Sequence, residues 1–203
     1  MLLDQFRIGP YLNFTYLVAE KPGGEGVVID PSFGIDPVLE AIDGRGVKVR
    51  YILNTHSHPD HIAGNGDVKE RTGAKVVAHR VAPIHQDISV SDGDALSVGT
   101  LRFHVVHTPG HTKDSVLYVF EGNVATGDTL FVGECGRTDL PGGDSSEMYD
   151  SLQHRVLALD DALVVLPGHD YGTTPTSTIG RERAENYTLQ PRTLAQFLAF
   201  MRE

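Results

Sequence analysis

The sequence has little cysteine, no long apolar run, and fewer basic than acidic residues. Its one cysteine, Cys135, excludes an intrachain disulfide framework. No window approaches the roughly 20 apolar residues of a membrane-spanning helix, and no basic stretch followed by an apolar one marks a signal peptide, so we expect no membrane partner. The formal net charge of -10 argues against nucleic acid, which requires a basic surface. We therefore predict a cytoplasmic protein.

What the sequence does contain is ordinary for a globular enzyme, with 40% hydrophobic and 22% charged residues. No linker, low-complexity tract or clean repeat divides the chain, so we expect a single domain over residues 1–203. A chain of this length buries roughly 70% of the surface that its unfolded form exposes. It is therefore long enough to build a rigid core around a functional site.

Apolar periodicity and turn signals predict strands and helices that alternate along the chain. The expected strands are 13–20, 26–30, 49–54, 75–79, 101–107, 116–120, 124–126 and 163–166. The expected helices are 36–42, 62–72, 147–159 and 194–201. Each half of the chain gives several strands followed by a helix, and two mixed sheets packed face to face with helices outside would bury their apolar faces.

The most informative segment is THSHPDH at residues 55–61, which follows the apolar, β-prone run 49–54. It holds four side chains that bind metals: His56, His58, Asp60 and His61. Pro59 prevents a long helix through these residues and favours an extended course before it. The segment is thus a loop at the end of a buried strand, and it predicts a divalent metal site.

Three more metal-binding side chains follow expected strands, each beside a glycine that lets the backbone approach a site closely. They are His111 in TPGHT, Asp128 in TGDT and His169 in PGHD. If these strand ends converge, one metal can bind His56, His58 and His111. A second can bind Asp60, His61 and His169, with Asp128 bridging the two. Imidazole and carboxylate suit zinc, iron or manganese, and ligand sets that leave room for water are typical of catalytic sites.

Taken together, the motifs HxHxDH, TPGHT, TGDTLF and PGHDYG resemble those of the metallo-β-lactamase superfamily. The resemblance covers nearly the whole chain, from the strand 49–54 to His169. It implies an α+β fold, a four-layer αβ/βα sandwich of two facing mixed sheets with helices outside. It also implies the same seven residues as metal ligands at one edge of the sandwich.

Several branches of the superfamily fit this sequence poorly. Secreted β-lactamases place a cysteine where Asp128 stands, the flavin-linked diiron branch replaces His58 by glutamate, and the nuclease branch carries an inserted domain. Two branches fit well, the glyoxalase II-like thioester hydrolases and the glutathione-persulfide dioxygenases. The stretches 136–140, 169–172 and 177–179 resemble the dioxygenases more closely.

The two branches imply different chemistry for one set of ligands. A hydrolase would hold two divalent cations, expected to be zinc, and would attack a glutathione-type thioester with a metal-activated hydroxide; Asp60 and Asp128 would be its catalytic carboxylates. A dioxygenase would hold one Fe2+ on His56, His111 and Asp128. The sequence favours the hydrolase by a narrow margin, because the ligand set is complete for two metals. A metal-binding protein without turnover is the third alternative.

The expected substrate is a small thiol derivative similar to glutathione. Arg137 is expected to bind its carboxylate and Tyr171 to donate a hydrogen bond to it. An equally weighted alternative for Arg137 is an ion pair with Asp139 or Asp144. Asp30 is expected to cap a turn, and Cys135 to be a small buried residue. The remaining histidines are expected to be structural or on the surface, and a homodimer is compatible with the sequence.

Overall fold

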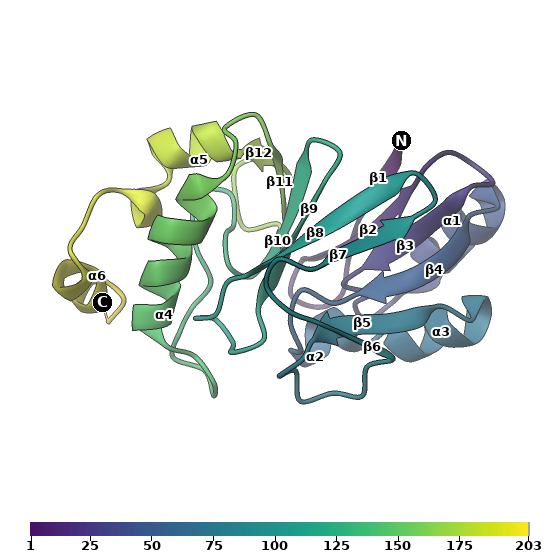
Figure 1. Cartoon of the computed structure of the whole chain (residues 1–203), viewed down its shortest axis with the longest axis horizontal. Coiled ribbons are helices and arrows are strands. Elements are labelled where there is room, and N and C mark those ends of the chain that lie inside the picture. The colour runs from purple at the N-terminus through teal and green to yellow at the C-terminus, as the bar shows by residue number, and fades with distance from the viewer. Residues whose placement is uncertain (203) are drawn as a thin grey trace.

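The computed structural model describes residues 1–202, which form two six-stranded sheets packed face to face with helices on their outer sides (Figure 1). The strands are β1 (Leu2–Ile8), β2 (Asn13–Ala19), β3 (Glu25–Ile29), β4 (Lys48–Leu53), β5 (Lys75–His79), β6 (Ile88–Val90), β7 (Ala95–Val98), β8 (Leu101–His107), β9 (Val116–Phe120), β10 (Asn123–Gly127), β11 (Val164–Pro167) and β12 (Ser177–Thr178). The α-helices are α1 (Asp36–Arg45), α2 (Pro59–Ile62), α3 (Asn65–Thr72), α4 (Ser145–Asp150), α5 (Ile179–Glu185) and α6 (Leu194–Phe200). This architecture confirms the predicted α+β sandwich of two mixed sheets.

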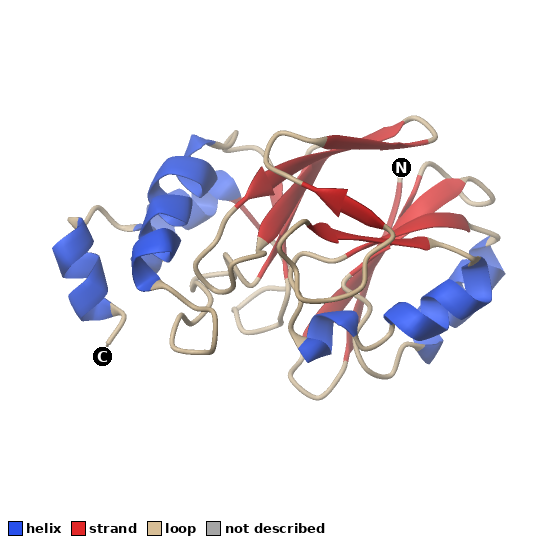
Figure 2. Cartoon of the chain, turned by 60° about the horizontal axis from the view of Figure 1, so that its bottom comes forward, coloured by secondary structure: helices blue, strands red, loops and turns tan. Residues whose placement is uncertain are grey.

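Both sheets combine parallel and antiparallel pairs. The first has the order β1-β2-β3-β4-β5-β6, antiparallel up to β3 and parallel from β3 to β6. The second has the order β12-β11-β10-β9-β8-β7, in which only β10 and β11 pair in parallel. Figure 2 shows the strands in the middle of the molecule and the helices at its two outer sides. No helix within residues 1–202 is long and apolar enough to cross a membrane.

Three apolar layers hold the four structural layers together. Along β2, Tyr16 and Val18 face the other sheet, whereas Leu17 and Ala19 face the helices, because successive side chains of a strand point to opposite faces. The central layer lies between the sheets, and the outer layers lie under α1 and α3 on one side and under α4, α5 and α6 on the other. Burial on both faces explains why β2 is apolar almost throughout instead of alternating.

Two expected helices are divided in the structure. The helix expected over 62–72 is instead α2 and α3, separated at Ala63 and Gly64. The helix expected over 147–159 is α4 followed by a π-helical turn, η1 (Ser151–Arg155), and a 3-10 turn, η2 (Val156–Ala158). A further 3-10 turn, η3, is Tyr187–Leu189. A uniform apolar spacing does not reveal a local change in helical pitch, so the sequence pattern missed these breaks.

Other boundaries were also predicted incorrectly. The first helix was expected to end at 42, but α1 continues to Arg45 and ends at Gly46, which adopts the left-handed conformation with φ of 64°. Strands β1, β6, β7 and β12 and helix α5 were not predicted. All four of these strands lie at the edges of the sheets, where partial exposure weakens the apolar signal that identifies buried strands.

Candidate metal centre

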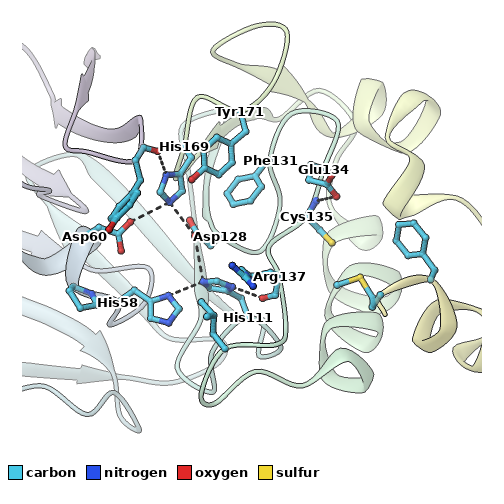
Figure 3. Close-up of a pocket in the computed structure, with 15 residues that line it drawn as sticks. His58, Asp60, His111, Asp128, Phe131, Glu134, Cys135, Arg137, His169 and Tyr171 are labelled. Atoms are coloured by element: carbon cyan, nitrogen blue, oxygen red, sulfur yellow. Dashed lines mark hydrogen bonds and ion pairs between the residues drawn. The ribbon is translucent and has the colours of Figure 1, made fainter. Parts of the chain in front are cut away.

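The seven expected ligands meet where the two sheets open onto the same end of the sandwich. Figure 3 labels five of them: His58, Asp60, His111, Asp128 and His169. The first sheet supplies four of them, from the loop after β4 and from α2. The second sheet supplies three, each directly after a strand: His111 after β8, Asp128 after β10 and His169 after β11. The polar ends of separate buried strands therefore converge in space, as the sequence pattern predicted.

The first group of ligands consists of three imidazoles. Nδ1 of His58 lies 3.1 Å from Nε2 of His56 and 2.9 Å from Nε2 of His111. His56 and His111 are almost completely buried, and His58 is half-buried. Three ring nitrogens that face one another at these distances have the spacing of ligands around a single tetrahedral cation, whose bonds to nitrogen are about 2.0–2.1 Å long.

The second group contains Asp60, His61 and His169. Their ligand atoms are close: Nε2 of His61 lies 3.1 Å from Nε2 of His169, and Oδ2 of Asp60 lies 3.6 Å from each of them. Asp128 lies between the groups, with Oδ1 3.3 Å from Nε2 of His61 and Oδ2 3.4 Å from Nε2 of His111. Two groups joined by one carboxylate can hold one cation or a bridged pair.

The donor atoms of these residues are better satisfied by a divalent cation than by hydrogen bonds to one another. Oδ1 of Asp128 is buried and has no hydrogen-bond partner among the described residues, which is costly unless a cation or a water compensates it. Within the first group, the histidine nitrogens have mainly other histidine nitrogens opposite them, and two imidazoles can share only one proton between them. A metal ion would satisfy both features at once.

The other ring nitrogen of most ligand histidines is already occupied. In His111, Nδ1 lies 2.7 Å from the backbone carbonyl oxygen of Arg137. In His169, Nδ1 lies 2.8 Å from the backbone carbonyl oxygen of Tyr11. These contacts fix the tautomer that directs the Nε2 lone pair into the centre, as is usual for metal-binding imidazoles.

Asp30 supports His61 in the same way, which corrects the expectation that it only caps a turn. Its Oδ2 lies 3.1 Å from Nδ1 of His61, and its Oδ1 accepts the backbone N–H of Thr55 at 2.7 Å. Asp30 has a φ of 47°, a conformation that aspartate tolerates better than most residues. The sequence did not reveal this role, since Asp30 and His61 lie 31 positions apart.

Burial and charge shape the pKa values of the metal-free site. Burial lowers the pKa of His56 well below its usual value, which favours a neutral imidazole with a free lone pair. Burial also opposes the charged form of His61, but the carboxylates of Asp128, Asp30 and Asp60 outweigh it and raise its pKa to about 9. Neighbouring histidines likewise overcome burial at Asp128 and hold its pKa well below the usual range. The excess of carboxylate charge around His61 favours a cation there.

Two glycines allow the ligand loops to approach Asp128 closely. A Cβ atom on Gly136 would overlap the backbone oxygen of Asp128, and one on Gly168 would overlap its Oδ1. Any larger residue at these positions would displace the loop that carries a ligand.

A cavity of about 740 Å3 opens above the metal centre. Tyr171 lines it and stacks on the ring of His169, with ring centroids 4.7 Å apart and planes 9° apart. Arg137 also lines it, but its guanidinium donates to both oxygens of Asp139 at 2.6 Å, the ion pair given as an alternative from the sequence. The sequence did not identify four further lining residues: Phe131, Glu134, Phe200 and Met201. Phe200 and Met201 lie at the C-terminal end of α6, far in sequence from every expected metal ligand.

A family model described as the metallo-beta-lactamase superfamily matches residues 8–85 and 80–169. The chain belongs to the metallo-β-lactamase superfamily. This confirms the resemblance inferred from the four motifs. The matched residues include the seven ligands that meet at the cavity.

Named relatives fall into two classes of enzyme. The human mitochondrial persulfide dioxygenase ETHE1 is 33% identical over 196 residues, which cover 95% of this chain and 76% of that protein. The hydroxyacylglutathione hydrolase of Anaeromyxobacter dehalogenans is 38% identical over 173 residues. That alignment covers 84% of this chain, which spans about two thirds (66%) of the length of the hydrolase.

One solved structure matches the chain over its whole length. The crystal structure of ETHE1 from Myxococcus xanthus superposes with a TM-score of 0.94 at 34% sequence identity. The match covers 100% of this chain and 91% of that one. The relatives named here are thus enzymes of this superfamily, dioxygenases and a hydrolase.

Proposed function

We propose that this protein is an iron-dependent dioxygenase that acts on the persulfide of a small thiol. The observation that carries the proposal is the extent of the likeness to the dioxygenases. It includes the segments after His169, among them α6, that form a wall of the cavity. The narrow preference for hydrolysis drawn from the sequence rested on the ligand set alone, which both branches share.

The proposed reaction converts a persulfide R–S–SH, dioxygen and water into the thiol R–SH, sulfite and two protons. Dioxygen is the oxidant, the outer sulfur is oxidised, and the sulfur–sulfur bond breaks. A bound Fe2+ would supply open positions for sulfur and oxygen, held by two histidines and one carboxylate: His56, His111 and Asp128. The stacked rings of His169 and Tyr171 line the cavity beside this set.

The remaining metal-binding side chains have their own roles in this proposal. Asp60, His61 and His169 surround the free edge of the Asp128 carboxylate, and His58 lies between the two iron-binding imidazoles. The imidazoles of His61 and His169 hold the pKa of that carboxylate well below its usual range, against the effect of its burial. Asp60 is itself held by Asn13, whose Nδ2 donates to its Oδ2 at 2.8 Å.

A second candidate function is hydrolysis of a thioester with two divalent cations. The observation that favours it is that both ligand groups are complete and share Asp128. Two bound cations would supply hydroxide at neutral pH by lowering the pKa of a shared water from 15.7 to about 7. A thiol has a pKa of about 8.5, so the leaving thiolate departs without a dedicated proton donor.

The first experiment compares two metal forms of one preparation. Protein loaded anaerobically with Fe2+ and protein loaded with Zn2+ are each given a persulfide and a thioester. Oxygen uptake with formation of sulfite by the iron form alone supports the dioxygenase. Thioester cleavage by the zinc form without oxygen uptake by the iron form supports the hydrolase and overturns our proposal. Absence of both activities in metal-loaded protein supports a metal-binding protein without turnover.

Asp60→Ala separates the two chemistries further. It removes a ligand of the second cation, so a hydrolase that needs two cations should lose its activity. A dioxygenase that uses one iron should lose roughly 10- to 100-fold, because only a supporting contact is removed. Asp67→Ala, at an exposed position in α3, is the matched control. Full loss of oxygen uptake in Asp60→Ala, with iron still bound, would contradict the role given to Asp60.

A further inference from the structure

Apolar side chains line the part of the cavity that reaches α6. Figure 3 labels two of them, Phe131 and Cys135. We define the apolar arm by the four residues that line it: Phe131, Cys135, Phe200 and Met201. They come from the loop after β10 and from the C-terminal end of α6. Phe131 forms the end of the arm nearest the metal centre. Its ring packs against those of His169 and Tyr171, with centroids 5.7 and 5.3 Å away.

Among the described residues, none that lines the arm carries a positive charge. Apart from the histidines of the metal centre, Arg137 is the one basic side chain among the described residues that line the cavity, and Asp139 neutralises it. Arg192 approaches the arm from behind, but its guanidinium packs over the ring of Phe200, 4.5 Å from its centroid. It donates to the backbone oxygen of Tyr187 at 2.6 Å.

The wall of the arm carries a negative charge instead. Glu134 lines the cavity, and its carboxylate accepts hydrogen bonds from the hydroxyl of Tyr187 and, at 3.1 Å, from the backbone N–H of Cys135. Burial and Glu134 raise the pKa of Cys135 to about 12, so this thiol stays neutral and adds to the apolar lining. A carboxylate that entered the arm would leave water and face Glu134, with no cation among the residues that line the arm.

We propose that the substrate of this protein carries an uncharged apolar group, aromatic or aliphatic, on its reactive thiol, and that this group binds in the apolar arm. The sequence had suggested a thiol similar to glutathione, which carries two carboxylates. The proposal rests on the proposed function in one respect only, that the reacting group is derived from a thiol.

Binding can test this without turnover. Zn2+-loaded protein is titrated calorimetrically with 2-phenylethanethiol and with glutathione. Both thiols offer the metal the same sulfur, so the ratio of their dissociation constants reports the rest of the molecule. We expect the phenyl compound to bind about 10- to 100-fold more tightly, from burial of its ring. Equal or tighter binding of glutathione would overturn the proposal.

Two variants test whether the phenyl group binds in the arm. Phe200→Ala should weaken the binding of 2-phenylethanethiol by about 10-fold. Phe33→Ala, which removes an exposed aromatic ring outside the cavity, is the control. Glu134→Gln should strengthen the binding of glutathione by about 2- to 5-fold and so narrow the ratio between the two thiols. If neither variant changes the ratio, the arm is not the binding site.

The same comparison in the activity assay separates the two proposals. Phenylethyl persulfide and glutathione persulfide are given to the iron form, and the corresponding thioesters to the zinc form. Conversion of the phenylethyl compound at the higher kcat/KM, in either assay, supports the apolar arm. A higher kcat/KM for glutathione overturns it. Failure of oxygen uptake overturns the dioxygenase while the binding ratio still decides the substrate class.

Discussion

Individual residues behind the metal centre decide how firmly each ligand is held. Asp30 and the carbonyl oxygens of Tyr11 and Arg137 occupy the outer ring nitrogens of three ligand histidines. In each contact, a side chain or backbone oxygen that could otherwise bind water binds a ring nitrogen instead. They orient imidazoles that a cation would then meet without further rearrangement.

Replacement of Asp30 should therefore weaken metal binding without removal of a ligand. Asp30→Asn can still accept from the N–H of Thr55, but an amide nitrogen replaces Oδ2, the oxygen that faces both Nδ1 of His61 and the hydroxyl of Thr55. We expect the affinity for Zn2+ to fall about 10- to 100-fold. Competition with a chromophoric chelator measures it, and the exposed Asp36→Asn is the control. Unchanged affinity for Zn2+ would show that Asp30 does not support His61.

A second histidine pair, away from the metal centre, makes stability depend on pH. His79 is 4% exposed and stacks on His107, with ring centroids 4.0 Å apart. Burial, together with His107, lowers the pKa of His79 to about 4. The unfolded chain therefore takes up a proton near pH 6.5 that the folded protein takes up only near pH 4. Stability should fall as the pH drops through this window.

The metal-free protein gives the clearest test of this dependence. The melting temperature of the wild type should fall from pH 7 to pH 5 more steeply than that of His79→Gln, which has no proton to gain. Parallel curves for the two proteins would show that His79 does not titrate differently on folding.

Helix α6 is the element on which the proposed substrate class depends, and it is short. It begins at a capping box: Oγ1 of Thr193 accepts the N–H of Gln196 at 3.3 Å, and Oε1 of Gln196 accepts the N–H of Thr193 at 2.8 Å. Phe197 anchors it to α4, where its ring lies 5.5 Å from that of Tyr149. The apolar arm thus depends on local capping as much as on packing.

Removal of the cap should affect stability and binding together. Thr193→Ala is expected to lower the free energy of unfolding by about 1 kcal/mol, because an orphaned N–H of the first turn loses its acceptor. It should also weaken the binding of 2-phenylethanethiol more than the binding of glutathione, since α6 carries two residues of the arm. Chemical denaturation and calorimetry measure the two effects. Thr193→Ser, which keeps the hydroxyl, should restore both, and failure to do so would place the effect elsewhere.

At the scale of the whole molecule, the metal centre joins the two sheets. The first sheet provides His56, His58, Asp60 and His61, and the second provides His111, Asp128 and His169. In the metal-free protein, seven polar side chains lie where the sheets meet, five of them less than 10% exposed. A bound cation would connect the sheets at that edge.

Metal loading should accordingly raise the melting temperature. A cation present at about 1,000 times its dissociation constant stabilises the folded state by about 4 kcal/mol, which for a chain of this size corresponds to a shift on the order of 10 °C. Scanning calorimetry with Zn2+ and with a chelator measures the shift. Mg2+, which prefers oxygen ligands, is the control and should have little effect. A melting temperature independent of Zn2+ would mean that the seven residues do not bind it.

Much of the fold and of the candidate site could be predicted from the sequence, because both were written in local patterns. Buried strands are apolar runs, and each ligand motif directly follows one, so the metal centre could be inferred without coordinates. Edge strands such as β1 and β7 were missed, because their exposed faces dilute the apolar signal. The break within 147–159 was missed because apolar spacing continues across it.

The sequence by itself determined the superfamily, the seven candidate ligands and the order of the elements that carry them. Only the tertiary structure decided what surrounds those ligands. It placed Asp30 behind His61, paired Arg137 with Asp139, and brought Phe200 and Met201 to Cys135 as an apolar arm. The reason is physical: a strand or a motif is specified by neighbours a few positions away. Contacts between residues far apart in the chain depend on how all the layers pack together.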